Sequence, residues 1–220
     1  MGKNEKAIQW MQEGKYAEAA KLLEEIIEEN PSDAIGYINY GNLLYKLNEF
    51  EPAERFFRKA ISLDEKAATA YYGLGNLYFS QQQFEKANAY LQLTLEHGLE
   101  DAHVYYLLGL SLQHQGQFKL ALPYLMRAAE IEPEESAYLF QYGLSLARSE
   151  QLDLAKKMFL KVIELDRNHS DAFYNLGVIA MFENQADVAL QHFAKALEIQ
   201  PGHHLAANGK NQVEQLLKHE

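Results

Sequence analysis

The stretch AYYGLGNLYF, residues 70–79, places two glycines in a segment that is otherwise rich in large apolar and aromatic residues. A glycine inside a helix costs about 1 kcal/mol relative to alanine, so a glycine here needs a compensating role. The second glycine, Gly75, is one of a series. Its counterparts stand 34 residues apart, at Gly41, Gly75, Gly109, Gly143 and Gly177. The quoted stretch is therefore one copy of a repeat.

Other positions follow the same step. The alanines are Ala19, Ala53, Ala87, Ala121, Ala155 and Ala189. Four residues before the glycines stand Tyr37, Tyr71, Tyr105, Leu139 and Phe173. Four residues after the alanines stand Leu23, Phe57, Leu91, Leu125, Phe159 and Phe193. A repeat of this length without insertions predicts a solenoid of stacked units.

Each repeat has the pattern of two helices. Apolar residues follow the spacing of one helix face before the glycine and again after the alanine. Between the two helices, four repeats carry a residue that tolerates a left-handed backbone, namely Gly14, Asn48, Gly116 or Asn184. We expect Gly75 to face Ala87 of the partner helix, so that two small residues let the helix axes approach.

The pattern YxxLGxxY at residues 71–78, followed by Phe84, Ala87 and Leu91, resembles the tetratricopeptide repeat (TPR). The sequence is most similar to small stand-alone cytosolic TPR proteins of Gram-positive bacteria. The resemblance implies an all-α fold, a right-handed α-solenoid that forms a single domain over residues 1–220. We expect about six repeats and a C-terminal capping helix, with bounds 1–33, 34–67, 68–101, 102–135, 136–169, 170–203 and 204–220.

The third repeat ends in TLEHGLED, residues 94–101, where several others have an acidic residue and proline. Gly98 is either a hinge between two halves of the solenoid or an ordinary glycine cap of a helix, and the sequence favours the cap. In the tail, Leu205, Val213, Leu216 and Leu217 are expected to form the buried side of the capping helix.

The composition excludes several classes of function. The formal net charge of −11 argues against nucleic-acid binding, which needs clustered lysine and arginine. The chain contains no cysteine, which excludes disulfides and thiolate metal sites and fits a cytoplasmic location. No apolar run approaches the length of a membrane span, so we expect no membrane partner.

The first helices carry a second stripe of mostly apolar residues besides the one that faces the partner helix. The stripe reads Ile38, Asn42, Tyr45; Tyr72, Asn76, Phe79; Tyr106, Leu110, Gln113; Phe140, Leu144, Ala147; and Tyr174, Val178, Met181. A helix that is apolar on two sides is either buried twice or presents a binding surface. The resemblance implies that this stripe lines the concave side, where TPR domains hold peptides. The alternative is packing against the next repeat.

Polar residues also fall on this inward-facing edge. Asparagine amides at Asn39, Asn42, Asn76 and Asn175 could bind the backbone of an extended peptide, or satisfy local hydrogen bonds. Gly73 lies on the same edge and could leave room for a ligand chain. Lys46, His114 and Arg148 supply sparse positive charge. The candidate groove is Asn39, Asn42, Tyr45, Tyr72, Asn76, Phe79, Tyr106, Leu110, His114, Phe140, Arg148, Tyr174 and Asn175.

No catalytic or cofactor motif stands out. The adjacent pair His203–His204 lacks any supporting metal-ligand motif, and the GLG at residues 73–75 lies inside a helix and is not a nucleotide-binding loop. The TPR clamp that binds acidic chaperone tails needs lysines, and this chain has Thr69, His103 and Ala137 at their places. A chaperone-tail receptor is therefore disfavoured.

These observations lead to a non-catalytic interaction module or scaffold that binds an extended peptide or short helix of a partner protein in the groove. It needs no cofactor or metal, and a monomer is favoured. The alternative is an intracellular sensor of a small signalling peptide that acts by releasing a partner.

Overall fold

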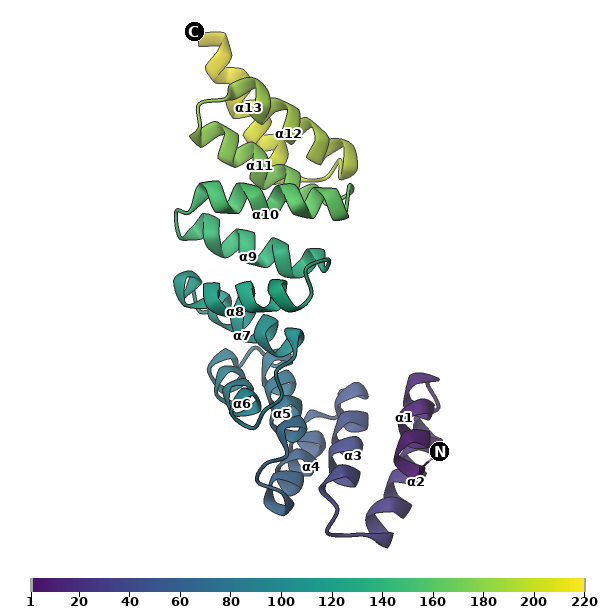
Figure 1. The fold of residues 1–220 in the computed structure, drawn as a ribbon. Coiled ribbons are helices and arrows are strands. Elements are labelled where there is room, and N and C mark those ends of the chain that lie inside the picture. Colours follow the sequence, from purple (N-terminus) through teal and green to yellow (C-terminus); the bar gives the residue numbers. More distant parts are fainter. Residues whose placement is uncertain (1, 220) are drawn as a thin grey trace. The chain divides into compact units, whose positions relative to one another are not determined.

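The computed structural model describes residues 2–219, and over these residues the chain forms thirteen α-helices and no strand (Figure 1). The first six helices are α1 (Lys3–Gln12), α2 (Tyr16–Glu29), α3 (Ala34–Lys46), α4 (Phe50–Leu63), α5 (Ala68–Ser80) and α6 (Phe84–Glu96). The others are α7 (Ala102–His114), α8 (Phe118–Ile131), α9 (Ser136–Arg148), α10 (Leu152–Leu165), α11 (Ser170–Phe182), α12 (Ala186–Ile199) and α13 (His204–His219). The all-α fold expected from the repeat is confirmed.

The chain divides into two compact units. Unit 1 holds residues 1–115, with α1 to α7, and unit 2 holds residues 116–220, with α8 to α13. Within unit 1 the closest helix pairs are α1–α2, α3–α4 and α5–α6, and within unit 2 they are α9–α10 and α11–α12. Each pair is one repeat, and within a unit the second helix of one repeat packs against the first helix of the next. The first helices of neighbouring repeats also contact one another in unit 1, as α11 and α13 do in unit 2.

The turns between the two helices of a repeat use a left-handed residue, as expected. Gly14, Asn48, Gly116 and Asn184 have φ values of +76°, +63°, +73° and +57°. The same conformation occurs in the two remaining repeats at residues without the usual preference for it, Gln82 and Glu150, with φ values of +58° and +64°. The backbone shape of the repeat therefore prevails over the local side chain.

The repeating glycine has a different partner from the expected alanine. A Cβ atom on Gly75 would lie 2.7 Å from Leu91 Cγ, and one on Gly177 would lie 2.6 Å from Phe193 Cε1. These large residues come four positions after the alanine and are fully buried. The glycine accommodates a large side chain of the second helix, so the expected contact between Gly75 and Ala87 was wrong.

The space beside Gly73 is also occupied by a side chain of the protein itself. A Cβ atom there would lie 2.4 Å from Cε1 of Phe57, which belongs to the preceding repeat. The expectation that Gly73 leaves room for a ligand was therefore wrong. In the tail, Gly209 meets Phe193 in the same way, at 2.7 Å from Cζ.

The chain ends behave as caps, with one correction. In the first repeat Ala7, which replaces the glycine, is completely buried. At the other end the expected capping helix is α13, but its buried side is formed by Ala206, Gly209 and Val213. Of the four residues expected there, only Val213 is buried, whereas Leu205, Leu216 and Leu217 are exposed.

Gly98 caps α6 in the ordinary way. Its φ is +87°, its N–H donates to the carbonyl of Leu95, and the next N–H, of Leu99, donates to the carbonyl of Thr94. The glycine cap favoured by the sequence is confirmed, and the division into two units falls after Gln115. Within residues 2–219, the helices are too short or too polar to cross a membrane.

Candidate functional site: the stripe on the first helices

The stripe on unit 1 comes from α3, α5 and α7, and hydroxyl groups link these helices to one another. The hydroxyl of Tyr45 on α3 lies 2.6 Å from that of Ser80 on α5. The hydroxyl of Tyr72 on α5 lies 2.7 Å from Nδ1 of His103 on α7. Burial raises the pKa of Tyr72. This part of the stripe is therefore engaged in bonds between repeats.

The four predicted asparagines differ in their burial and in their hydrogen-bond partners. Asn39 is buried, with 7% of its surface exposed, and its amide donates to Asn4 Oδ1 on α1 at 2.8 Å. Asn76 and Asn175 donate to the carbonyl four residues earlier in their own helices, at 3.1 Å and 2.8 Å. Asn42 is exposed. The bonding of Asn39 between helices leaves it unsuited to hold a peptide, whereas the other three remain within reach of solvent.

Aromatic rings fill the rest of the unit 1 stripe. Phe79 lies edge-on to Phe84 and to His114, with ring centroids 5.6 Å and 6.1 Å away. His114 stacks face to face on Phe84 at 4.4 Å. Tyr106, whose ring centroid lies 6.1 Å from that of His103, and Leu110 are half-buried on α7. Of the predicted residues, Phe79 and His114 therefore contact each other.

The stripe on unit 2 instead lines two hollows. Between α9 and α11 runs a cavity of about 620 Å³. Its walls include Phe140, Leu144, Ala147, Tyr174 and Val178, all from the stripe. A second hollow of about 540 Å³ shares the side chains of Tyr174 and Val178 and continues to α13. We call these two hollows together the unit 2 groove.

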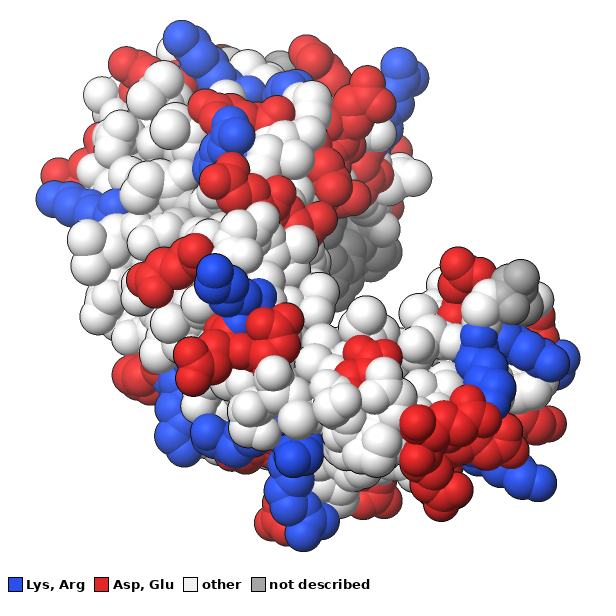
Figure 2. Space-filling model, turned by 60° about the horizontal axis from the view of Figure 1, so that its bottom comes forward, with Lys and Arg blue, Asp and Glu red and all other residues white. Residues whose placement is uncertain are grey.

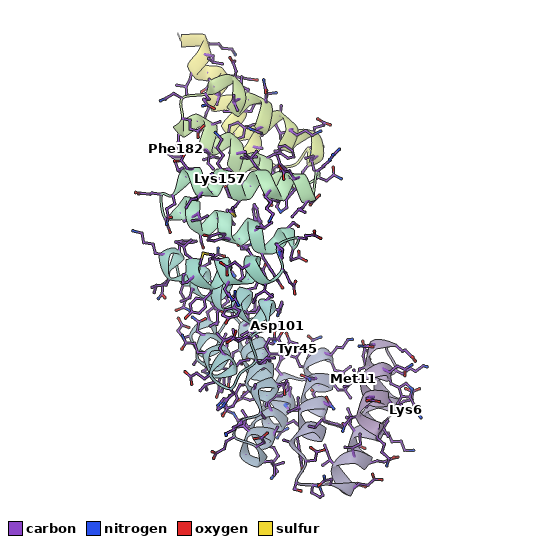
Figure 3. All side chains as sticks on the ribbon, viewed as in Figure 1. Lys6, Met11, Tyr45, Asp101, Lys157 and Phe182 are labelled. Atoms are coloured by element: carbon purple, nitrogen blue, oxygen red, sulfur yellow. The ribbon has the colours of Figure 1, made fainter. Side chains whose placement is uncertain are left out.

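Much of the lining of the unit 2 groove is aromatic or aliphatic, and its polar side chains are Arg148, Asp171, Asn175, Asn208 and Gln212. Phe140 packs against His169 with ring centroids 4.5 Å apart, and Tyr174 against His203 at 5.2 Å. At the end of α11, Phe182, labelled in Figure 3, is 70% exposed. Across the groove on α13, Leu205 is 57% exposed. Such exposed apolar side chains around a hollow are typical of a surface that binds a partner.

Sequence reasoning missed several residues of this groove, although the repeat could have indicated them. Phe182 occupies the position of Lys46, His114 and Arg148 in its repeat. Asn208 and Gln212 on α13 stand 34 residues after Tyr174 and Val178. The step therefore continues into the tail, where the loss of the glycine motif hid it.

A separate hollow of about 750 Å³ lies between α4 and α6, and its polar groups bond to one another. The hydroxyl of Tyr78 donates to Glu54 at 2.8 Å, and Arg58 donates to the same carboxylate oxygen, also at 2.8 Å. Burial alone would raise the pKa of Glu54, but these two hydrogen bonds hold it below its usual value. We ascribe to this cluster a structural role. Over the described residues, His, Asp and Glu side chains form no group suited to a metal ion.

The face of the molecule drawn in Figure 2 carries side chains of both charges. Figure 2 shows acidic side chains with basic ones scattered among them and uncharged surface between.

Comparison with known proteins identifies the repeat. Models of the tetratricopeptide repeat match residues 11–59, 41–82, 72–137 and 140–204. This chain belongs to the tetratricopeptide-repeat family. YrrB of Bacillus subtilis is 56% identical over 41 residues, a match that spans 19% of this chain and 20% of YrrB.

Solved structures agree with this assignment. The crystal structure of YrrB, described as a TPR protein with an unusual peptide-binding site, is 43% identical, with a TM-score of 0.84 over 87% of this chain and 99% of its own. PilF of Pseudomonas aeruginosa has a TM-score of 0.81 at 16% identity and covers 96% of both chains. MamA has a TM-score of 0.71 at 21% identity, over 76% of this chain and 92% of its own. The last two show the fold alone.

Proposed function

We propose that this TPR protein is a non-catalytic interaction module, and that the unit 2 groove binds an extended segment or a short helix of a partner protein. The observation that carries the proposal is the groove itself. Its walls are stripe residues of α9 and α11, and its rim keeps Phe182 and Leu205 exposed. The description of YrrB as having a peptide-binding site supports a similar role here.

Burial of the exposed rim would supply much of the binding energy. Covering one phenylalanine or leucine side chain stabilises a complex by about 1.5–3 kcal/mol. Asn175 and Asn208 flank the groove and offer amide groups to the backbone of a guest. In unit 1, Asn42 and Asn76 offer the same groups, while Tyr45 and Tyr72 are held in bonds between helices.

The remaining parts of the proposal rest on the sequence. The absence of cysteine favours a cytoplasmic site of action, and a monomer remains the preferred oligomeric state.

The test uses peptides selected from a random-peptide display library against the whole chain. Binding of a labelled selected peptide is measured by fluorescence anisotropy to the native protein and to Phe182→Ser. We expect about tenfold weaker binding to Phe182→Ser, because an exposed aromatic anchor is lost. The matched control is Leu160→Ser, since Leu160 is a partly exposed leucine on the second helix α10.

The outcome is decided by the contrast between these two variants. Equal affinity for Phe182→Ser and the native protein would reject the groove. A selection that returned only peptides sensitive to Leu160→Ser would move the binding surface to the second helices.

A further inference from the structure

Three basic side chains occupy the same place in their repeats and are held in the same way. Each stands at the C-terminal end of a first helix, and each lies over the aromatic residue that begins the second helix of the preceding repeat, 30 positions earlier. The pairs are Lys46 over Tyr16 at 5.6 Å, His114 on Phe84 at 4.4 Å and Arg148 over Phe118 at 5.4 Å.

These three side chains are free to meet an anion. All three residues are exposed. Over residues 2–219, none of them forms an ion pair with a carboxylate, although the chain has 31 acidic residues. Lys46 donates to the carbonyl of Met11, labelled in Figure 3, at 3.2 Å, which engages one of its three donors. The aromatic rings hold the basic groups in place while leaving donors unused.

Arg148 also lies where the unit 2 groove can use it. Its side chain lines the 620 Å³ hollow between α9 and α11. On its other side it lines a smaller hollow of about 310 Å³ together with Lys119 and Leu120, which is 60% exposed. A guest in the hollow between α9 and α11 therefore meets the guanidinium group of Arg148. The carboxylate of Asp171 lines the same hollow, and it is already bonded to Nε2 of His203 at 3.0 Å. Arginine has a planar fork of donors that matches a carboxylate.

We propose that the partner segment is acidic, with an aspartate or glutamate side chain that binds Arg148 while neighbouring apolar side chains fill the unit 2 groove. This proposal rests on the proposed function and adds the chemistry of the guest.

A structural role for these residues makes a different prediction. A cation at the C-terminal end of a helix stabilises the helix through its dipole. Under that role alone, replacing Arg148 would lower the melting temperature and leave the choice of peptide unchanged. Reversal of the charge separates the two roles, because only recognition reverses the preferred charge of the guest.

The experiment repeats the random-peptide selection with four forms of the whole chain: native, Arg148→Glu, Arg148→Lys and, as a control, Lys157→Glu on the second helix α10. We expect native protein, Arg148→Lys and Lys157→Glu to enrich Asp or Glu beside apolar residues, and Arg148→Glu to enrich Lys or Arg there. In the best native peptide, Glu→Gln should weaken binding to native protein by about tenfold, because a charge-assisted hydrogen bond is lost. The Arg148→Glu protein should bind the Gln form of this peptide at least as tightly as the Glu form.

Failure of this inference differs from failure of the proposed function. Peptides that bind natively, lose affinity in Phe182→Ser and show no acidic preference would overturn the acidic guest and leave the groove standing. Peptides insensitive to Phe182→Ser would overturn both. A melting shift in Arg148→Glu without a change in the enriched sequences would establish the structural role and reject recognition.

Discussion

The stripes of the two units occupy the same positions of one repeat but present different surfaces. In unit 1, Tyr72 and Tyr45 reach across to bond the neighbouring first helix. In unit 2, Phe140 stands at the position of Tyr72 and leaves no hydroxyl for such a bond, and an open hollow runs beside it. Beneath both stripes the large residues of the second helices fill the space over the glycines. The comparison shows that the exposed stripe of a repeat can change while the buried contacts between the glycines and the large residues of the second helices stay the same.

The largest expected effect concerns the buried contacts between glycines and large side chains. Gly73→Ala would place a Cβ atom 2.4 Å from Phe57 Cε1 in unit 1, and Gly209→Ala one 2.7 Å from Phe193 Cζ in unit 2. Overpacking costs about 1–3 kcal/mol, while alanine regains about 1 kcal/mol of helix propensity. We expect a net loss of up to about 2 kcal/mol in urea unfolding for both variants.

The control for this pair is Gly202→Ala, at a site with nothing within 4 Å of the added atom, which should change stability by less than about 0.5 kcal/mol. The double variant Phe57→Leu with Gly73→Ala should recover part of the loss, since leucine occupies the equivalent place at Leu91. A loss of stability in only one of the two glycine variants would show that the buried glycine contacts of the two units are not equivalent.

The second prediction concerns the surfaces. An apolar fluorescent dye should bind the unit 2 groove, and Phe182→Ser should weaken its binding by about tenfold, since one exposed aromatic side chain is removed. Asn42→Ala, on the unit 1 stripe, should leave the titration unchanged. Equal effects of the two variants would contradict the contrast between an open and an engaged stripe.

Much of this structure was predictable from the repeat, because packing recurs at every step. The helices, the left-handed turns at Gly14, Asn48, Gly116 and Asn184 and the glycine-capped end at Gly98 follow from residues whose backbone needs are local, whereas the left-handed turns at Gln82 and Glu150 do not. The contacts of Gly75 and Gly73 were not predictable. Both glycines face large side chains of other helices, and the sequence does not show which side chain fills the space beside a glycine. The lining of the unit 2 groove was partly predictable, since Phe140 and Tyr174 of the stripe line the same hollow.

The part of the site that sequence could not supply is the difference between the units. Asn39, Asn76 and Asn175 look alike in the sequence, yet Asn39 is buried against α1 and the others bond within their own helices. Whether an amide faces a guest or a neighbour depends on side-chain directions that one sequence leaves open. The predicted site set as a whole stays a prediction.

A third prediction uses alkaline pH. Burial raises the pKa of Tyr40, Tyr71, Tyr72 and Tyr78 in unit 1, and that of Tyr142 in unit 2. A folded pKa above the unfolded value of about 10 keeps the neutral hydroxyl favoured, so stability is complete below about pH 10 and is lost as the pH rises through the folded pKa. Hydrogen exchange with mass spectrometry should therefore show unit 1 opening first. Simultaneous opening of both units would contradict this order.

The smallest expected effect lies in the turns, and it tests whether the two units share the same backbone. Gln82 in unit 1 and Glu150 in unit 2 hold positive φ without being glycine. Their change to glycine removes the strain of a left-handed side chain, about 1–2 kcal/mol, and adds freedom to the unfolded chain, which offsets about 0.4–1 kcal/mol. We expect Gln82→Gly and Glu150→Gly each to gain about 0.5–1 kcal/mol in urea unfolding. The reverse change, Gly14→Ala, should cost a similar amount, because an added Cβ there meets no atom within 4 Å and only φ opposes it. A gain at one turn and a loss at the other would show that a side chain, and not the shared backbone, determines the stability of these turns.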